Sequence, residues 1–241
     1  MQNALDRIRT VLVETHHPGN IGGAARALRT MGLSQLVLVR PVRYPDPQAE
    51  WRAAGGVDVL REARVVESLD SAIGDCGFVV GTSTRSRRIP WPVASAQEAA
   101  ERIVAEAAGR PVAILFGREA SGLENDELQR CHLHLQIDAN PDYPSLNLAM
   151  AVQVVAYEIR RAVLCGKPAE PWDRLPATVA DVDALMKHLE AVLVEVDFLD
   201  PGNPGQTMTR LRRLFARIQP DDTEVKMLRG ILTEIQRTLA S

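Results

Sequence analysis

Residues 111–159 read PVAILFGREASGLENDELQRCHLHLQIDANPDYPSLNLAMAVQVVAYEI. The apolar run 112–116 predicts a strand that ends at Gly117, and a loop containing Glu119 follows it. A second apolar run, 133–137, ends in a polar loop that meets a long predicted helix at residues 145–147. Loops at neighbouring strand ends are the usual position of a ligand in an α/β protein. This stretch therefore predicts an α/β fold and a cofactor site together.

The rest of the first two thirds of the chain repeats the same alternation of strand and helix. Near-continuous Val, Ile and Leu runs separated by helical segments are typical of a parallel sheet covered on both faces. Strands are predicted at 8–14, 36–40, 65–66, 78–82, 112–116 and 133–137, and helices at 21–31, 49–54, 69–75, 95–108, from 124, and 146–164.

The pattern changes after residue 166, which indicates a second unit. Residues 167–177 are rich in proline and lack periodicity, so we interpret them as a linker between an α/β domain at 1–166 and a helical domain at 178–241. Three helices are predicted in the second domain, at 178–196, 206–218 and 223–239. This small domain can bury little apolar surface alone, so we expect it to pack on the first domain or on a second subunit.

Composition restricts the function classes. The 241 residues carry 28 Lys and Arg against 31 Asp and Glu, a net charge of −3, so a nucleic-acid site would have to be a local basic patch. No apolar run approaches the roughly 20 residues that span a bilayer, and the N-terminus has no signal-peptide core. The three cysteines are scattered, as expected for structural thiols in a reducing cytoplasm.

The loop after the first strand contains His16, His17 and Asn20 before a glycine pair. Its glycines do not match the GxGxxG pattern, and the second strand ends without an acidic residue, so nicotinamide binding is disfavoured. The two histidines lack a matching Asp, Glu or Cys cluster for a metal, which favours a role in the loop itself. Asn20 has two open interpretations, a helix N-cap or a functional side chain. Arg26 lies in the second turn of the following predicted helix. It has two open interpretations, a side chain directed at the predicted ligand edge or a solvated surface arginine.

Two further segments place cations where RNA phosphates could be bound. The strand at 78–82 runs into Thr82, Ser83 and Thr84, whose hydroxyls suit a polar ligand, and then into Arg85, Arg87 and Arg88. In the helix at 206–218, the spacing places Arg210, Arg213 and Arg217 on one face and Leu211, Leu214, Phe215 and Ile218 on the opposite face. The alternative for both segments is that their arginines are simply exposed to solvent and bind no RNA.

Three segments in this order resemble the SpoU branch of the SPOUT RNA methyltransferases: 20–26 (NIGGAAR) with Gly32, 116–123 (FGREASGL) and 145–149 (SLNLA). The resemblance covers residues 5–165. Arg118, the loop GTSTRSR at 81–87 and the turn NPDY at 140–143 are similar to the TrmJ subgroup, whose members methylate the ribose 2′-hydroxyl of tRNA nucleotide 32. The chain departs from the broader family at residues 137–139 (IDA), where Ile-Pro-Met is common, and at Ala149, where serine is common.

The resemblance implies S-adenosylmethionine as methyl donor, a deep trefoil knot made by the last strands and helix of the domain, a homodimer, and tRNA as substrate. It also implies a cofactor cradle, whose expected residues are Thr82, Ser83, Thr84, Gly117, Ile137, Ser145, Leu146 and Asn147. Glycine at 117 would let the chain approach the ligand closely.

The resemblance further implies catalytic roles for Arg26, Glu119, Ser145 and Asn147. Arg26, from the same or the other subunit, would stabilise charge on the acceptor oxygen, since a guanidinium stays protonated. Glu119 would orient loops or take the proton if its pKa is tuned. RNA contacts are expected from Asn20, Arg26, Arg85, Arg87, Arg88, Arg210, Arg213 and Arg217. The alternatives are 2′-O-methylation of ribosomal RNA or of another tRNA position, and a non-catalytic RNA-binding protein.

Overall fold

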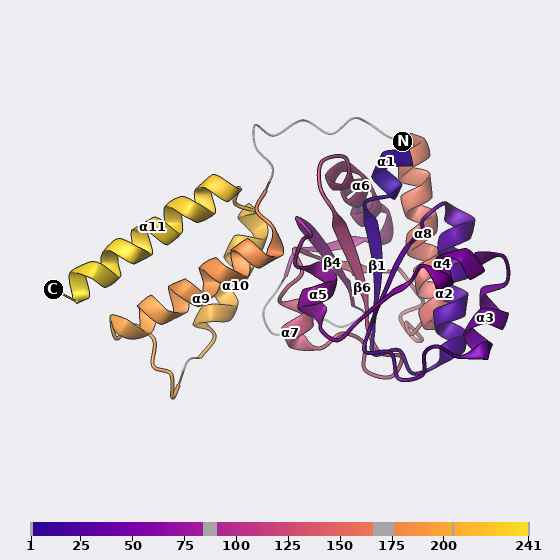
Figure 1. Ribbon diagram of the computed structural model, residues 1–241, viewed down its shortest axis with the longest axis horizontal. Helices are drawn as coiled ribbons and strands as arrows, with labels where there is room; N and C mark the ends of the chain where they lie inside the picture. The colour runs from indigo at the N-terminus through magenta and orange to yellow at the C-terminus, as the bar shows by residue number, and fades with distance from the viewer. Residues whose placement is uncertain (1, 84–90, 166–175, 204, 241) are drawn as a thin grey trace.

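The computed structural model describes residues 2–83, 91–165, 176–203 and 205–240. The first domain is a seven-stranded sheet in the order β3-β2-β1-β6-β4-β7-β5, and every neighbouring pair is parallel (Figure 1). The strands are β1 (Ile8–Val13), β2 (Gln35–Val39), β3 (Arg64–Val66), β4 (Phe78–Thr82), β5 (Val93–Ser95), β6 (Val112–Phe116) and β7 (Leu133–Gln136). The predicted α/β fold with a parallel sheet is confirmed.

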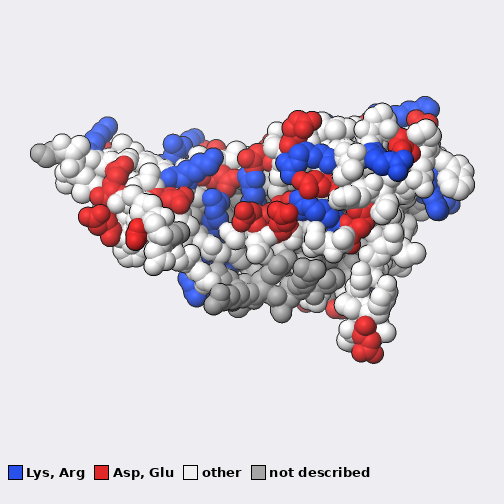
Figure 2. Space-filling model, turned by 90° about the horizontal axis from the view of Figure 1, so that it is seen from below, with Lys and Arg blue, Asp and Glu red and all other residues white. Residues whose placement is uncertain are grey.

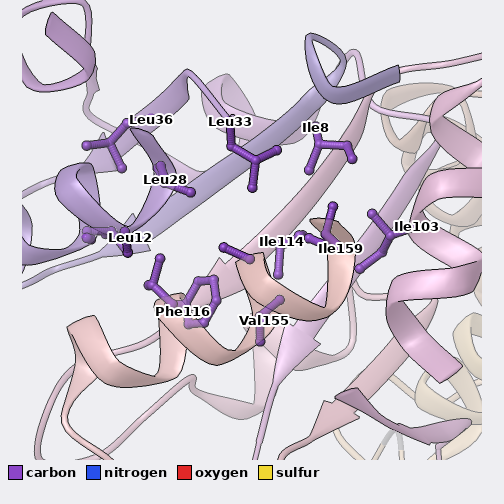
Figure 3. Packing of buried hydrophobic residues seen from close by; sticks show 14 of the residues in the cluster. Ile8, Leu12, Leu28, Leu33, Leu36, Ile103, Ile114, Phe116, Val155 and Ile159 are labelled. Atoms are coloured by element: carbon purple, nitrogen blue, oxygen red, sulfur yellow. The ribbon is translucent and has the colours of Figure 1, made fainter. Parts of the chain in front are cut away.

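Helices cover both faces of this sheet, because alternate strand residues point to opposite sides. On one face, Ile8, Leu12 and Phe116 of the strands pack against the long helices of the domain. Figure 3 shows two of the helix residues in this cluster, Val155 and Ile159. On the other face Val11, Val79 and Leu115 pack beneath two short helices. The helices of this domain are α1 (Gln2–Leu5), α2 (Pro18–Met31), α3 (Pro47–Ala53), the 3₁₀ turn η1 (Ala54–Gly56), α4 (Val57–Arg61), α5 (Leu69–Ile73), α6 (Ala96–Ala107), α7 (Asn125–Leu128) and α8 (Leu148–Cys165).

The predicted elements are present, with shifted ends. Helix α2 begins at Pro18, three residues before its predicted start, because proline is favoured in the first helical turn. His17 occupies the N-cap position, so the interpretation of Asn20 as an N-cap is wrong. Gly32 ends α2 in a left-handed conformation, as expected. Strand β5, which is only three residues long, and helices α1 and α4 were not predicted from the sequence.

The C-terminal helices α9 (Val179–Glu195), α10 (Thr207–Ile218) and α11 (Asp222–Leu239) lie beside the α5 and α7 side of the sheet (Figure 1). Their own core is small and contains Leu185, Val192, Val225 and Leu232. The opposite apolar face predicted for α10 is only partly buried. Phe215 packs on the small core, whereas Leu214 and Ile218 are 42% and 52% exposed. The predicted linker lies mostly outside the described residues.

Within the described ranges, none of the helices is both long and apolar enough to cross a membrane.

Packing of α2 on α3 leads to a stability prediction. A Cβ added at Gly22 would lie 2.0 Å from the Ala49 carbonyl oxygen, so Gly22→Ala must push the two helices apart. We expect a loss of about 1–3 kcal/mol in the free energy of unfolding. Gly19→Ala in the same helix is the matched control, because its Cβ would lie 3.6 Å from the Arg52 side chain. Urea unfolding should leave Gly19→Ala within about 0.5 kcal/mol of wild type, and equal losses in both variants would contradict this account.

Candidate active site

A cavity of about 240 Å³ opens where β4, β6 and β7 end, between the β6–α7 and β7–α8 loops. Six of the eight residues predicted for the cofactor line it: Thr82, Ser83, Gly117, Ile137, Ser145 and Leu146. Asn147 is not among the lining residues, and Thr84 lies outside the described ranges. Phe116, Leu135 and Leu148 add an apolar wall that sequence reasoning did not single out. The predicted position of the site, at the carboxyl ends of neighbouring strands, agrees with this cavity.

The β6–α7 loop folds back on itself at one end of the cavity. Arg118 and Gly122 exchange two backbone hydrogen bonds of 3.2 and 2.8 Å, and Gly122 has a φ of +71°. A Cβ on residue 117 would lie 2.1 Å from the Gly122 carbonyl carbon. Glycine at 117 is thus required by the loop's own backbone. The close approach of a ligand, which the resemblance implies for Gly117, stays a prediction.

Arg118 ties this loop to the end of β1. Its Nε donates to Glu14 at 2.7 Å, and its two Nη groups donate to the carboxylate of Glu127 at 3.0 Å each. Glu14 also accepts hydrogen bonds from Arg40. The hydrogen bonds from Arg118 and then Arg40 lower the pKa of Glu14 from 4.5 to about 2. Sequence reasoning noted Arg118 but missed its partners, because Glu14 is 104 residues away in the chain.

Both carboxylate oxygens of Glu119, the next residue, accept hydrogen bonds. Its carboxylate accepts the backbone N–H groups of His16 and His17 at 3.1 Å each and the amide of Asn20 at 2.9 Å. Burial alone would raise the pKa of Glu119, but these hydrogen bonds together lower it below its ordinary value. A low pKa and occupied oxygens do not suit a proton acceptor. The geometry favours the other predicted role, in which Glu119 orients the loops.

Asn20 continues this hydrogen-bond chain to the third segment. The Asn147 amide donates to Asn20 Oδ1 at 2.9 Å, and Asn147 Oδ1 accepts the backbone N–H of Ala149 in the first turn of α8. Glu119, Asn20 and Asn147 therefore link the loops after β6, β1 and β7. Asn20 is only 9% exposed and both ends of its amide are used. The RNA contact predicted for Asn20 therefore does not fit its position.

Arg26 lies away from this hydrogen-bond chain. Six residues separate it from Asn20 on α2, about 240° around the helix axis. Its side chain is exposed and is not among those that line the cavity of its own chain.

The predicted RNA-binding arginines are only partly visible. Arg210 and Arg217 are exposed and Arg213 is half-buried, whereas Arg85, Arg87 and Arg88 lie outside the described ranges. On the face shown in Figure 2, Lys and Arg alternate with Asp and Glu and form no broad basic surface. In the part of the chain that the structure describes, no three His, Cys, Asp or Glu side chains gather in a way that could hold a metal ion.

The model of the SpoU rRNA Methylase family matches residues 7–157, the segment that builds this cavity. The chain belongs to the SpoU methylase family. A second model, the C-terminal domain of the tRNA methyltransferase TrmJ, matches residues 180–241, which places the chain in the TrmJ group of that family. It is thus an enzyme of the methyltransferase class, and the expected resemblance is confirmed.

Known members of the family resemble the chain over nearly its whole length. The tRNA (cytidine/uridine-2'-O-)-methyltransferase TrmJ of Pectobacterium atrosepticum is 51% identical over 97% of this chain and 98% of its own. The crystal structure of TrmJ from Z. mobilis ZM4 superposes with a TM-score of 0.82 at 34% identity, covering 95% of this chain and 98% of that one. A structure described as giving insights into the 2-OH methylation of C/U34 on tRNA is 28% identical, with a TM-score of 0.53 over 67% of this chain and 99% of its own.

The depressed pKa of Glu14 leads to a pH prediction. Its contribution to stability is full above pH 4.5 and is lost as the pH falls toward about 2. Glu14→Gln should therefore lower the free energy of unfolding at pH 7 by roughly 2–3 kcal/mol and remove part of the acid dependence. The measurement is the melting temperature from pH 2 to 7, with Glu50→Gln, at an exposed position on α3, as control. If both variants follow the wild-type curve, the Arg118–Glu14 pair does not hold the loop.

Proposed function

We propose that this enzyme transfers the methyl group of S-adenosylmethionine to a ribose 2′-hydroxyl of tRNA, at nucleotide 32 of the anticodon loop. The observation that carries the proposal is the cavity at the strand ends, with the Glu119–Asn20–Asn147 chain joining the three family segments beside it. The similarity to the P. atrosepticum enzyme over 97% of the chain supports tRNA as substrate and cytidine or uridine as target. We place the enzyme in the cytoplasm, where tRNA is modified.

The cavity suits S-adenosylmethionine by its position at the strand ends and by the character of its wall. Phe116, Leu135 and Leu148 offer apolar surface for an adenine ring, while Thr82 and Ser83 stand at the end of β4. The Thr82 hydroxyl donates to the Leu115 carbonyl at 2.9 Å, so it holds β4 to β6 and can offer a ligand only its lone pairs. When bound, this cofactor supplies a sulfonium methyl that is already reactive.

The chain's own residues then have to align the acceptor and stabilise charge on its oxygen. Ser145 lies on the cavity wall and Asn147 directly precedes α8, so the Glu119–Asn20–Asn147 chain fixes the loop against which the acceptor ribose would rest. The guanidinium of Arg26 stays protonated and would stabilise the developing alkoxide.

Arg26 can reach a cavity if the enzyme is a homodimer in which it serves the other copy. Along α8, Met150, Tyr157 and Leu164 recur every seven residues and are exposed, whereas the other apolar positions of the helix apart from Cys165 are buried or half-buried. Seven residues are about two helical turns, so the three side chains form one apolar stripe. We propose this stripe as the dimer contact, since α2, which carries Arg26, packs beside α8. The deep trefoil knot implied by the resemblance stays a prediction.

Nucleotide 34 is the second candidate target, favoured by the likeness to the structure concerned with C/U34 of tRNA. That structure is only 28% identical and covers 67% of this chain. Position 32, which the resemblance to the TrmJ subgroup implies, therefore stays the first candidate. The experiment is incubation with unmodified tRNA or ribosomal RNA and labelled S-adenosylmethionine, followed by nucleoside mass spectrometry and site mapping. Methylation at 32 supports the proposal, methylation at 34 or of ribosomal RNA replaces the substrate, and absence of transfer to every RNA rejects the function.

Cofactor binding gives a prediction that does not depend on the RNA. S-adenosylhomocysteine at about 100 times its dissociation constant should stabilise the fold by about 2.7 kcal/mol, which raises the melting temperature. NAD should leave it unchanged, because the loop after β1 lacks the dinucleotide pattern. The measurement is the melting temperature with each ligand, and a rise with NAD but not with S-adenosylhomocysteine would overturn the assignment of the cavity.

A second prediction separates Arg26 from the cofactor. Arg26→Ala should abolish nearly all methyl transfer with cofactor affinity within a few-fold of wild type, and Arg26→Lys should rescue it only partly, because an ammonium lacks the planar fork. Mixing the Arg26→Ala variant with an inactive Asn147→Ala variant tests whether Arg26 of one subunit serves the site of the other. Mixed dimers would hold one complete site and recover about a quarter of wild-type activity, whereas no recovery would place Arg26 in its own subunit's site.

A further inference from the structure

The C-terminal helices are joined to the catalytic domain by a defined set of contacts, here called the docking seam: Val179, Ala180, Asp183, Arg212 and Gln219 on one side and Gly74, Cys76, Arg102 and Arg130 on the other. Val179 is buried among the core residues beneath α5 and α7. Its backbone N–H donates to the Cys76 carbonyl at 3.0 Å, and that of Ala180 donates to the Gly74 carbonyl at 3.2 Å. The first N–H groups of a helix have no partner within it, so these two hydrogen bonds fix the start of α9 on the catalytic domain.

The loop that receives α9 is itself held by the sheet. Arg9 on β1 is buried, and its guanidinium donates to the Ala72 carbonyl at 2.5 Å and to the Asp75 carboxylate at 2.7 and 2.9 Å. The segment 72–76 therefore has a fixed position relative to β1, and so does the start of α9.

A hinge at the start of α9 would still allow rotation, and an ionic cluster opposes it. Asp183, one turn into α9, accepts from Arg130 at 2.7 Å and from Arg212 of α10 at 2.8 Å. Arg130 pairs with Asp70 as well, so the cluster connects α5, α9 and α10. The Asp183 side chain is 19% exposed, which shields these ion pairs from solvent more than surface pairs.

A further contact supports the far end of α10. Arg102 on α6 donates to the side chain of Gln219 at 2.9 Å. Together with the ionic cluster, it holds α10 at two points, so that the orientation of that helix is fixed. Arg212 is engaged in the docking seam, whereas Arg210 and Arg217 on the same helix remain exposed.

We infer that Asp183 is a positioning residue for tRNA methylation, because it holds α10 in one orientation on the catalytic domain. In that orientation the exposed arginines of α10 would contact the body of a tRNA while its anticodon loop enters the cavity. Phosphate contacts of this kind set register and orientation without reading sequence. This inference rests on the proposed function. It assigns a role in tRNA methylation to Asp183, which does not line the cofactor cavity.

The test compares Asp183→Asn with Glu190→Gln, which removes the same charge at an exposed position of α9. Hydrogen exchange at the amides of Val179 and Ala180 reports opening of the docking seam without tRNA, and it should accelerate in Asp183→Asn alone. The same variant should lose kcat/KM for tRNA roughly ten- to a hundredfold, mainly through KM, with unchanged affinity for S-adenosylhomocysteine. Asp183→Glu, which keeps the charge, should recover part of the loss.

Gln219→Asn provides a second route if Asp183→Asn does not fold. Asparagine tolerates the left-handed backbone of residue 219 (φ 48°), yet it is too short to reach Arg102. It should weaken tRNA methylation in the same direction and by less. The inference would be overturned by unchanged tRNA kinetics in a variant whose Val179 and Ala180 amides exchange faster. It would also be overturned if these amides exchanged at the wild-type rate in both Asp183→Asn and Gln219→Asn. A wild-type enzyme that methylates no tRNA would instead refute the proposed function, while the exchange data would still test the docking seam.

Discussion

The carboxylate of Glu119 accepts hydrogen bonds from two backbone N–H groups of the loop after β1 and from Asn20, which in turn binds Asn147. Three loops that leave three different strands are thereby held by one acidic side chain. A carboxylate can serve in this way because it only accepts, and the donors around it are fixed backbone and amide groups. The shape of the cavity depends on this constraint.

The parallel sheet is what brings those loops together. Because β1, β6, β4 and β7 lie side by side in this order, with all carboxyl ends at one edge, the loops after β1, β6 and β7 meet there. The Arg118–Glu14 pair ties the same β6–α7 loop to the end of β1 from the other side, and Gly117 and Gly122 let that loop fold back. The cavity is thus a product of the topology, which also positions the candidate catalytic residues Glu119 and Asn147.

The sequence predicted the parallel sheet well and indicated the sheet edge where the cavity lies, because both follow from local patterns. Apolar runs and polar strand ends identified β1, β4, β6 and β7, whereas the cavity residues Gly117, Ile137 and Ser145 were named by the resemblance. It assigned Asn20 poorly, since a buried amide bridging two loops and an exposed one contacting RNA have the same sequence signature. It also missed the partners of Arg118 and the role of Asp183, because ion pairs between distant segments carry no local pattern. The sequence predicts the helical tail as a separate unit, but the attachment of the tail depends on contacts with residues 70–130 that only the fold brings near.

The most direct measurement of the central claim is a double-mutant cycle on kcat/KM for tRNA with Glu119→Gln and Asn147→Ala. These residues do not touch; Asn20 connects them. If the three act as one unit, the double variant will lose little more than the worse single variant, a coupling of at least about 1 kcal/mol. Glu119→Gln with Asp183→Asn is the control pair, whose losses should multiply, since the two residues share no hydrogen-bond partner among these contacts. Losses that multiply in the Glu119 and Asn147 pair as well would contradict the account.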